Sequence, residues 1–282
     1  MSGLVVVITG TSSGIGFQAA LQAAARGHKV VATMRNPEKA PRLVEAAHVA
    51  GHSVDVRMLD LGQANQIDPF IERVVSDYGR LDVVVNNAAM GALGTIEWRG
   101  MSELRNVMEV NFFGPVNLSR AALPHLRKSR GQILSVTSEG GIVAGAFSEA
   151  YCASKFAMEG FMEALAPVAH TVGVRVTLIE PGPVETEFYD NLGVEDPEIW
   201  VAEAGPYGTQ FGQYLPQLFS ALGGPLMQSA ADAAKVIVDL IGQPRPPLRI
   251  QTSQVATDRI SFKLADLDGS RVIERASAWL SQ

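Results

Sequence analysis

Four times along the chain, a helix-like segment ends at a glycine and a short β-branched run follows directly. The glycines are Gly27, Gly79, Gly131 and Gly173, and the runs after them occupy residues 28–33, 80–85, 132–136 and 174–179. Glycine closes a helix in the left-handed conformation without a Cβ clash, and near-continuous apolar runs are typical of strands covered on both faces. Further runs at 4–9, 53–59 and 248–251, most of them separated by room for a crossover helix, bring the predicted number of strands to seven. The sequence therefore predicts an α/β fold, a doubly wound parallel sheet with helices on both faces.

The composition argues against several kinds of partner. Of the 282 residues, 47% are apolar and 18% are charged, which is enough material for a large core. The 23 basic and 29 acidic residues give a net charge of −6 without runs of like charge, which argues against nucleic acid or an anionic membrane as a partner. No apolar stretch approaches the ~18 residues that span a bilayer, so membrane insertion is not expected.

Cysteine and histidine usage argues against a metal site. The single cysteine, Cys152, excludes an internal disulfide and a Cys-rich metal site, and the 5 histidines show no ligand spacing. Cys152 itself is expected to be a small buried residue. The N-terminus carries neither a basic region nor a small-residue cleavage signal. We therefore expect a cytoplasmic protein that holds no metal.

One domain over residues 1–282 is expected, because no linker or break in composition occurs before residue 183. Residues 183–228 differ from the rest, since bulky apolar side chains stand there among glycines and prolines. These are Phe188, Tyr189, Trp200, Tyr207, Phe211, Tyr214, Leu215, Leu218, Phe219 and Met227. A long insertion of this kind tends to be a lid or a substrate-binding loop. A pair of short helices at a subunit interface is an equally good interpretation.

The first predicted strand ends in a glycine-rich turn that leads directly into a helix-like segment at 17–26. The turn is Thr9-Gly10-Thr11-Ser12-Ser13-Gly14-Ile15-Gly16. Glycines let the backbone turn tightly and approach a pyrophosphate, whose charge then lies at the positive end of the helix. The spacing is G-x-x-x-G-x-G, and the register of strand, turn and helix predicts a dinucleotide site.

The residues after the second predicted strand bear on which nucleotide is bound. In the general dinucleotide fold, an acidic residue about 20 positions after the glycines accepts from the ribose 2′-hydroxyl of NAD. This chain has Ala32-Thr33-Met34-Arg35-Asn36 there, with no carboxylate to repel a 2′-phosphate. Arg35 is able to pair with that phosphate and Ser13 to donate a hydrogen bond to it. The pattern favours NADP(H) and leaves NAD(H) open, since a solvated loop arginine is the alternative interpretation of Arg35.

Two further polar segments follow the third and fourth predicted strands. Asp60-Leu61 lies where an adenine would be expected, and the carboxylate is able to accept from its amino group, although a helix N-terminal acid fits the same pattern. The amides of Asn86 and Asn87 are able to bridge neighbouring strands, and Ala88 leaves room for a ribose.

Tyr151 and Lys155 are separated by four residues and therefore lie on one face of a predicted helix. A free tyrosine, with a pKa of about 10, is a poor acid or base at neutral pH, and a neighbouring ammonium favours its phenolate. Ser138 ends the fifth predicted strand, at the sheet edge where ligands of such folds bind. Its hydroxyl is therefore expected to hold a substrate carbonyl against the tyrosine.

Asn111 lies in a long helical segment predicted over 102–127. Gly114-Pro115 follows it, at a place where a helix is able to kink and free a carbonyl. A lone helical asparagine is more often structural than functional.

Taken together, these residues resemble the short-chain dehydrogenase/reductase family. The motifs that match in order and spacing are Thr9-Gly10-x-x-x-Gly14-Ile15-Gly16, Asn86-Asn87-Ala88-Ala89, Asn111, Ser138, Tyr151-x-x-x-Lys155 and Pro181-Gly182-Pro183-Val184-x-Thr186. The resemblance covers roughly residues 4 to 190 and implies a Rossmann-type oxidoreductase. It is greatest toward the NADP(H)-using 17β-hydroxysteroid and retinol dehydrogenase-like members. The chain departs from the family at Ala89, where the motif has glycine, and from Glu187 onward.

The resemblance implies a role for each of these residues. Tyr151 would be the general acid in reduction, Ser138 would orient the carbonyl, and Lys155 would bind the nicotinamide ribose and support the tyrosine. Asn111 would hold a water in a proton relay. The residues implied in nucleotide binding are Gly10, Ser12, Ser13, Gly14, Ile15, Gly16, Arg35, Asp60, Leu61, Asn87, Ala88, Tyr151, Lys155, Pro181, Gly182, Val184 and Thr186.

The leading hypothesis is an NADP(H)-dependent oxidoreductase that interconverts a ketone or aldehyde with an alcohol. The apolar residues of 183–228 favour a bulky apolar substrate such as a steroid, retinoid, polyketide or aryl ketone. The family resemblance implies a homodimer or homotetramer. A non-catalytic NADP(H)-sensing regulatory protein is the alternative, and the presence of all four catalytic candidates argues against it. An epimerase or dehydratase is disfavoured by the glycine spacing and by the lack of a larger C-terminal domain.

Overall fold

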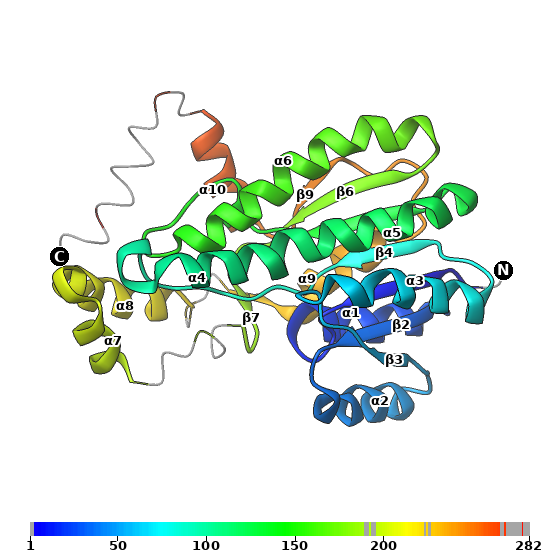
Figure 1. Cartoon of the computed structure of the whole chain (residues 1–282), viewed down its shortest axis with the longest axis horizontal. Helices are drawn as coiled ribbons and strands as arrows, with labels where there is room; N and C mark the ends of the chain where they lie inside the picture. The colour runs from blue at the N-terminus through cyan, green and yellow to red at the C-terminus, as the bar shows by residue number, and fades with distance from the viewer. Residues whose placement is uncertain are drawn as a thin grey trace.

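A seven-stranded parallel sheet forms the centre of the computed structural model, which describes residues 3–188, 192, 196–222, 224, 227–265, 268 and 278 (Figure 1). The strands are β1 (Val5–Thr9), β2 (Lys29–Met34), β3 (Asp55–Met58), β4 (Val83–Asn86), β5 (Gln132–Val136), β6 (Arg175–Glu180) and β9 (Arg249–Gln251). Their order is β3-β2-β1-β4-β5-β6-β9, so the chain reverses its direction of travel across the sheet between β1 and β4. The predicted doubly wound, seven-stranded parallel sheet is confirmed.

Helices cover both faces of the sheet because successive strand residues point to opposite sides. Val5 and Val7 of β1 belong to one core cluster with residues of α3 (Ala64–Tyr78), α5 (Gly114–Ser129) and α6 (Glu149–Thr171). Val6 and Ile8 belong to the cluster on the other face, with residues of α1 (Gly14–Ala25), α2 (Ala40–Val49) and α9 (Ala230–Leu240) (Figure 1). Both faces are thus apolar, which explains the near-continuous apolar runs of the sequence.

One of the four predicted helix ends differs from the expectation. Before β5, the residue in the left-handed conformation is Arg130, with φ 53°, and not Gly131. Gly131 is needed for space, because a Cβ there would collide with the carbonyl oxygen of Asp82. The other three predicted glycines, Gly27, Gly79 and Gly173, have positive φ as expected.

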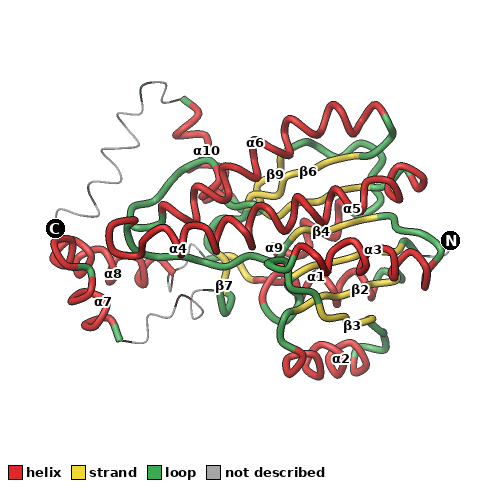
Figure 2. Tube along the Cα trace, viewed as in Figure 1, coloured by secondary structure: helices red, strands yellow, loops and turns green. Residues whose placement is uncertain are grey.

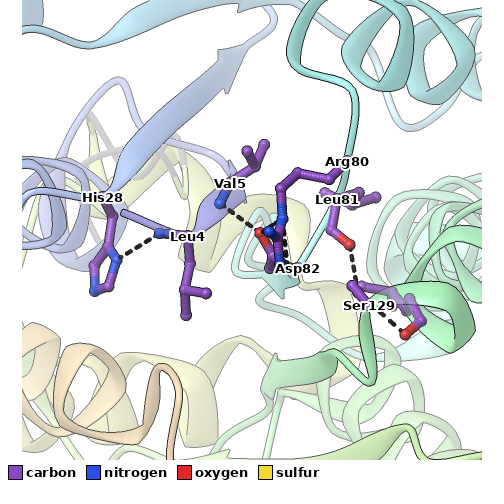
Figure 3. A network of polar contacts seen from close by, with 8 residues as sticks. Leu4, Val5, His28, Arg80, Leu81, Asp82 and Ser129 are labelled. Atoms are coloured by element: carbon purple, nitrogen blue, oxygen red, sulfur yellow. Dashed lines mark hydrogen bonds and ion pairs between the residues drawn. The ribbon is translucent and has the colours of Figure 1, made fainter. Parts of the chain in front are cut away.

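Polar side chains tie the amino ends of the strands together (Figure 3). The carboxylate of Asp82 is 3% exposed and accepts a hydrogen bond from the Val5 backbone N–H at 2.8 Å, while Arg80 donates to both of its oxygens. His28 Nδ1 accepts from the Leu4 backbone N–H at 3.3 Å. Burial, and then the charge of Arg26, lower the pKa of His28, which suits a neutral imidazole that accepts a hydrogen bond. These polar side chains at this end of the sheet therefore bond to the backbone or to one another.

The segment at 183–228 forms its own small core. It contains β7 (Val184–Glu185), α7 (Pro197–Glu203), one short helical turn at Gly205–Tyr207, α8 (Gly208–Leu222) and β8 (Gln228–Ser229). Strand β8 pairs with β7. The buried aromatic and aliphatic residues of α7 and α8 pack on Leu93 and Phe147, from the loops after β4 and β5. Figure 2 shows α7 and α8 at the left of the molecule, away from the strands. Tyr189, predicted with this segment, lies outside the described residues.

The predicted long helix over 102–127 is interrupted. α4 (Ile96–Met108) and α5 are joined by a π-helical turn, Glu109–Phe113, which carries Asn111. The last described helix, α10 (Gln254–Leu264), follows β9. Among the described residues, no helix combines the length and the apolar character that a membrane crossing requires.

Candidate active site

A cavity of about 770 Å³ lies at the carboxyl ends of the strands. Its wall includes the residues that follow β1, β2, β4, β5 and β6, so it spans the point between β1 and β4 where the strand order reverses. In open α/β sheets, ligands bind in the crevice at this point. The volume is in the range of cavities that enclose cofactors and small molecules.

The glycine-rich turn after β1 forms the floor of one end of the cavity. Gly10 and Gly14 have φ of 69° and 58°, a conformation that a side chain would strain. A Cβ at Gly10 would lie 2.6 Å from the Cα of Ala88, and one at Gly16 would collide with the amide nitrogen of Asn87. Ser12, Ser13, Gly14, Ile15 and Gly16 all line the cavity. The backbone is thus exposed where side chains would fill the space, at the start of α1.

Thr9 and Asn87 fix this turn against the end of β4. The Asn87 amide donates to the carbonyl oxygens of Thr9 and Gly10 at 2.8 and 3.1 Å. In return, the Thr9 hydroxyl oxygen accepts from the backbone N–H groups of Asn87 and Ala88 at 2.9 and 3.0 Å. The predicted bridging of neighbouring strands by Asn87 is therefore present, and both Asn87 and Ala88 line the cavity.

Cationic and polar side chains line the far end of the cavity, after β2 and β3. Arg35 lies there with Lys39 and Asp60, and the neighbouring Leu61 lines the wall. The Asp60 carboxylate also accepts from the Gly62 backbone N–H at 3.0 Å, so it combines a turn-forming role with a place in the cavity wall. Lys39 also pairs with Glu187 at 3.4 Å, a residue of the 183–228 segment.

Tyr151 and Lys155 lie one helical turn apart on α6, facing the middle of the cavity. The Lys155 ammonium is 5.8 Å from the centre of the Tyr151 ring and donates to the carbonyl oxygen of Val136 at 3.1 Å. Lys155 is 3% exposed. Burial lowers its pKa to about 8, against the opposing effect of the Glu159 charge. The ammonium form is therefore still the major one at neutral pH.

Ser138 follows β5 and lines the same cavity as this pair. Its hydroxyl oxygen accepts from the Gly140 backbone N–H at 2.9 Å, at the start of the short helix Glu139–Gly141. A Cβ at Gly140 would lie 3.3 Å from the Ser138 hydroxyl and 3.4 Å from the Tyr151 ring. The serine hydroxyl and the tyrosine ring thus approach one glycine from two sides, and both line the cavity.

Asn111 is placed differently from the other predicted catalytic residues. It is 1% exposed and is not part of the cavity wall. Its side-chain oxygen accepts from the Met90 N–H at 2.8 Å, and its amide nitrogen donates to the Met90 carbonyl at 2.9 Å and to the Ser154 hydroxyl at 3.0 Å. The side chain therefore fastens the loop after β4 to the helix that carries Tyr151.

The loop after β6 closes the cavity from the remaining side. Pro181, Gly182, Val184 and Thr186 all line it, as the sequence predicted. A Cβ at Gly14 would lie 2.9 Å from the Thr186 methyl group, so this loop lies directly against the glycine turn.

The sequence did not predict that Lys39, Arg259 and Phe262 line the cavity. Phe188, which was predicted as part of the 183–228 segment, also lines it, with its ring centre 5.5 Å from that of Tyr151. Arg259 forms an ion pair with Glu139, next to Ser138. No motif marks Arg259 and Phe262, because the packing of α10 brings them to the site. Lys39 lies in the short helix after β2, also without a motif.

Similarity to known proteins identifies the family of this chain. A family model described as short chain dehydrogenase matches residues 4–196. The chain belongs to the short-chain dehydrogenase family. As in that family, it is an oxidoreductase that acts on alcohol or carbonyl groups.

Two curated relatives of this short-chain dehydrogenase match along nearly the whole chain. Retinol dehydrogenase 8 of Bos taurus is 38% identical over 98% of this chain and 89% of its own length. The 17-beta-hydroxysteroid dehydrogenase type 1 of Homo sapiens is 34% identical over 97% of this chain and 84% of its own length. The similarity therefore extends past residue 196 into the segment that the sequence analysis left unmatched.

Solved structures share the fold. A short-chain dehydrogenase from Streptomyces avermitilis is 30% identical, with a TM-score of 0.77 and 98% of each chain covered. A metagenomic short-chain oxidoreductase solved with NADP is 26% identical, with a TM-score of 0.70 over 89% of this chain and 97% of that one. A Burkholderia phymatum protein solved with NAD has the same fold, with a TM-score of 0.80, 23% identity and 95% of each chain covered.

Proposed function

We propose that this short-chain dehydrogenase uses NADP(H) to interconvert a bulky apolar ketone or aldehyde with its alcohol, with Tyr151 as general acid and base. The observation that carries the proposal is the meeting of Tyr151, Lys155 and Ser138 in the middle of one cavity. At one end of that cavity the wall is exposed backbone with cationic side chains, and at the other it is apolar.

The nucleotide end fits a nicotinamide dinucleotide. Gly10, Gly14 and Gly16 leave the backbone bare at the start of a helix, in space that a Cβ would fill. This arrangement suits a pyrophosphate, which needs close approach to backbone N–H groups. The residues that would hold the nucleotide are Gly10, Ser12, Ser13, Gly14, Ile15, Gly16, Arg35, Asp60, Leu61, Asn87, Ala88, Pro181, Gly182, Val184 and Thr186. When bound, the nicotinamide would supply or accept the two electrons of the reaction.

In the reducing direction, Ser138 would donate a hydrogen bond to the carbonyl oxygen of the substrate. Tyr151 would then deliver its phenolic proton to that oxygen as the alcohol forms. The Lys155 ammonium, 5.8 Å from the Tyr151 ring centre in a buried site, favours the resulting phenolate. In the oxidising direction, the phenolate would take the proton of the alcohol.

The preference for NADP(H) is supported by charge. Arg35 and Lys39 line the cavity after β2, where an NAD-binding protein of this general fold has an acidic residue. A guanidinium pairs with a phosphate in two parallel hydrogen bonds, which a ribose hydroxyl cannot match.

The preference for a bulky apolar substrate is supported by the opposite end of the cavity. Phe188, Leu192, Tyr214, Leu218 and Phe262 line it there. These residues come from the 183–228 segment and from α10, so the segment acts as a cover for the substrate in this proposal. Burial of apolar surface drives the binding of apolar ligands.

A homodimer or homotetramer is also part of the proposal. Phe113, Phe156 and Phe161, from the π-helical turn and α6, are 46, 37 and 38% exposed. Phe113 and Phe161 both contact Phe112 edge-on, so they form one exposed apolar patch, and such a patch is typical of an interface.

A pair of fluorescence titrations with NADPH and NADH, followed by assays of NADPH oxidation with all-trans-retinal and a 17-ketosteroid, tests the proposed function. We expect tighter binding of NADPH than of NADH, and oxidation that depends on the carbonyl compound. Binding of NADPH without turnover of either compound would overturn the proposed reaction in favour of a nucleotide-sensing protein. Equal affinity for the two nucleotides would overturn the cofactor preference alone.

A further inference from the structure

Helix α6 carries a third ionisable side chain in line with Tyr151 and Lys155. Glu159 follows Lys155 by four residues, so the three side chains lie on one face of the helix, one turn apart. Glu159 is 3% exposed and, unlike Tyr151 and Lys155, is not part of the cavity wall. A carboxylate is thus buried directly behind the lysine of the proposed site.

The end of β5 contacts both Lys155 and Glu159. The Val136 carbonyl accepts from the Lys155 ammonium at 3.1 Å, and the hydroxyl of the next residue, Thr137, donates to Glu159 Oε1 at 2.5 Å. The residue after that is Ser138, which faces the substrate in the proposed function. Consecutive residues of one strand end therefore set the positions of Lys155, Glu159 and the substrate carbonyl.

A cation on β9 holds the other oxygen of Glu159. The Arg249 guanidinium donates to Glu159 Oε2 at 3.0 Å and also lies 3.3 Å from Glu180 of β6 and 2.5 Å from Glu163 of α6. Burial raises the pKa of Glu159, and its hydrogen bonds with Thr137 and Arg249 oppose that rise.

Glu180 is the second buried carboxylate of this cluster. It is 0% exposed, and Gln251 donates to its Oε2 at 2.5 Å. Burial raises the pKa of Glu180 to about 7, so it carries a proton for much of the time near neutral pH. Arg249 is then available to stabilise the charge of Glu159. The charged and titratable groups that face Glu159 are thus Lys155, Glu163, Glu180 and Arg249.

The proposed site contains a buried positive charge that needs a compensating negative charge. A buried ammonium is costly unless a negative charge compensates it, and the depressed pKa of Lys155 is the result of that cost. Glu159 is the carboxylate that opposes the depression. We propose that Glu159 is a positioning residue of the reaction, whose negative charge keeps Lys155 protonated and thereby sets the alkaline limit of activity. This inference rests on the proposed function of Tyr151 and Lys155.

The test is Glu159→Gln, which keeps the shape of the side chain and removes its charge. At saturating NADPH, kcat/KM for all-trans-retinal is measured from about pH 6 to about pH 10. We expect the alkaline limb, the pH at which kcat/KM falls on the alkaline side, to be lower by about one pH unit than in the wild type. This is the effect of one charge a few ångströms away in a protein interior. Above that limb, kcat falls about tenfold while the KM for retinal is unchanged.

Glu163→Gln is the matched control. It removes the same charge from the same helix one turn further on, and it also breaks an ion pair with Arg249. The Glu163 side chain is 56% exposed, so its charge is screened from Lys155 by solvent. We expect its pH profile to match that of the wild type. An equal shift in both variants, or no shift in either, would overturn the inference.

A second readout needs neither nucleotide nor turnover. A lysine whose pKa is lowered to about 8 in the folded protein, from 10.5 unfolded, makes the free energy of unfolding rise with pH between those values. In nucleotide-free Glu159→Gln this rise begins about one pH unit lower than in the wild type. An unchanged onset would contradict the inference.

Thr137→Val and Tyr151→Phe complete the design. If Glu159→Gln does not fold, Thr137→Val removes the hydroxyl that stabilises the charged form of Glu159, and a smaller downward shift of the same limb is expected. An unmoved limb in Thr137→Val would then overturn the inference. Retention of turnover by Tyr151→Phe would instead refute the proposed function. An inactive Tyr151→Phe together with an unmoved limb in Glu159→Gln would refute this inference alone.

Discussion

The two ends of the central sheet use polar side chains in opposite ways. At the amino end, Asp82 accepts from Val5 and pairs with Arg80, and His28 accepts from Leu4, so these groups stabilise the fold (Figure 3). At the carboxyl end, the polar groups of the proposed site line a cavity of about 770 Å³.

The difference follows from the topology of a parallel sheet. All strands point the same way, so the loops that enter the strands lie at one edge and the loops that leave them lie at the other. At the entering edge, the side chains of Asp82, Arg80 and His28 bond to the backbone at the start of β1 or to one another. At the leaving edge, the residues after β1 and β4 line the cavity where the strand order reverses. Substitutions at the two ends should therefore separate stability from activity.

The largest effect is expected from Tyr151→Phe, at the carboxyl end. Loss of the phenolic proton removes the proposed general acid, so turnover should fall by about 10³-fold or more. NADPH affinity and the unfolding temperature should stay close to those of the wild type, because the ring and its packing against Phe188 remain. Steady-state kinetics, fluorescence titration and thermal unfolding check these three quantities. Turnover near the wild-type level would remove Tyr151 from the mechanism.

Asp82→Ala tests the amino end, with stability as the readout. The change leaves the Val5 N–H without its acceptor in a buried position, so the free energy of unfolding should fall by about 3 kcal/mol. The kcat of the folded enzyme should be unchanged. Denaturant unfolding and steady-state kinetics on the same preparation measure both. Arg80→Ala is the control, and it should cost under about 1 kcal/mol, because the Arg80 side chain is 52% exposed.

Glu180→Gln sharpens the comparison, because its carboxylate is buried at the functional end. Its pKa is about 7 in the folded protein against 4.5 in the unfolded chain, so the folded state binds more protons between these values. The wild type should therefore lose about 2 to 3 kcal/mol of stability as pH rises from about 4.5 to about 7.

The Glu180→Gln variant should lack most of that loss. The difference in free energy of unfolding between the variant and the wild type should therefore shift in favour of the variant as pH rises across the same window. Denaturant unfolding at several pH values measures the slope. Parallel slopes in the two proteins would show that Glu180 titrates as it does in the unfolded chain.

The smallest effect is expected from Arg35→Ala. It should weaken NADPH binding by about tenfold to a hundredfold and NADH binding by no more than about threefold, since only NADPH carries the 2′-phosphate. Arg42→Ala is the control, because Arg42 pairs with Glu187 and is not part of the cavity wall. Equal losses of NADPH and NADH affinity in Arg35→Ala would mean that the 2′-phosphate is held elsewhere.

Local patterns were enough to predict the strands and the residues at their ends. Short runs along the chain, four of them directly after a glycine, place every strand within a few residues. The central strands are the clearest, because both faces of the sheet are covered there and the runs are almost wholly apolar. Gly14 and Ser138 were predicted to share one site because the carboxyl ends of parallel strands meet at one edge, and the family resemblance implied that Thr186 belongs to the same site.

What the sequence did not predict depends on contacts between distant segments. Gly114-Pro115 indicated a kink near Asn111, but no local pattern predicted that a π-helical turn forms there. The left-handed Arg130 also has no local pattern that distinguishes it from an ordinary helix end. Likewise, Arg259 and Phe262 reach the cavity through the packing of α10, which no local pattern of the sequence predicts. For 183–228 the sequence left a lid and an interface equally open, since aromatic residues serve both.

Amide hydrogen exchange with and without NADPH tests most directly whether the carboxyl end of the sheet is the functional one. Protection by NADPH should be confined to segments around 10–16, 33–39, 86–91, 138–145 and 181–188, which line the cavity. The amino-end segments around 4–5, 28, 80–82 and 129 should exchange at the same rate in both states. Protection at the amino end, or none at the glycine turn, would contradict the account.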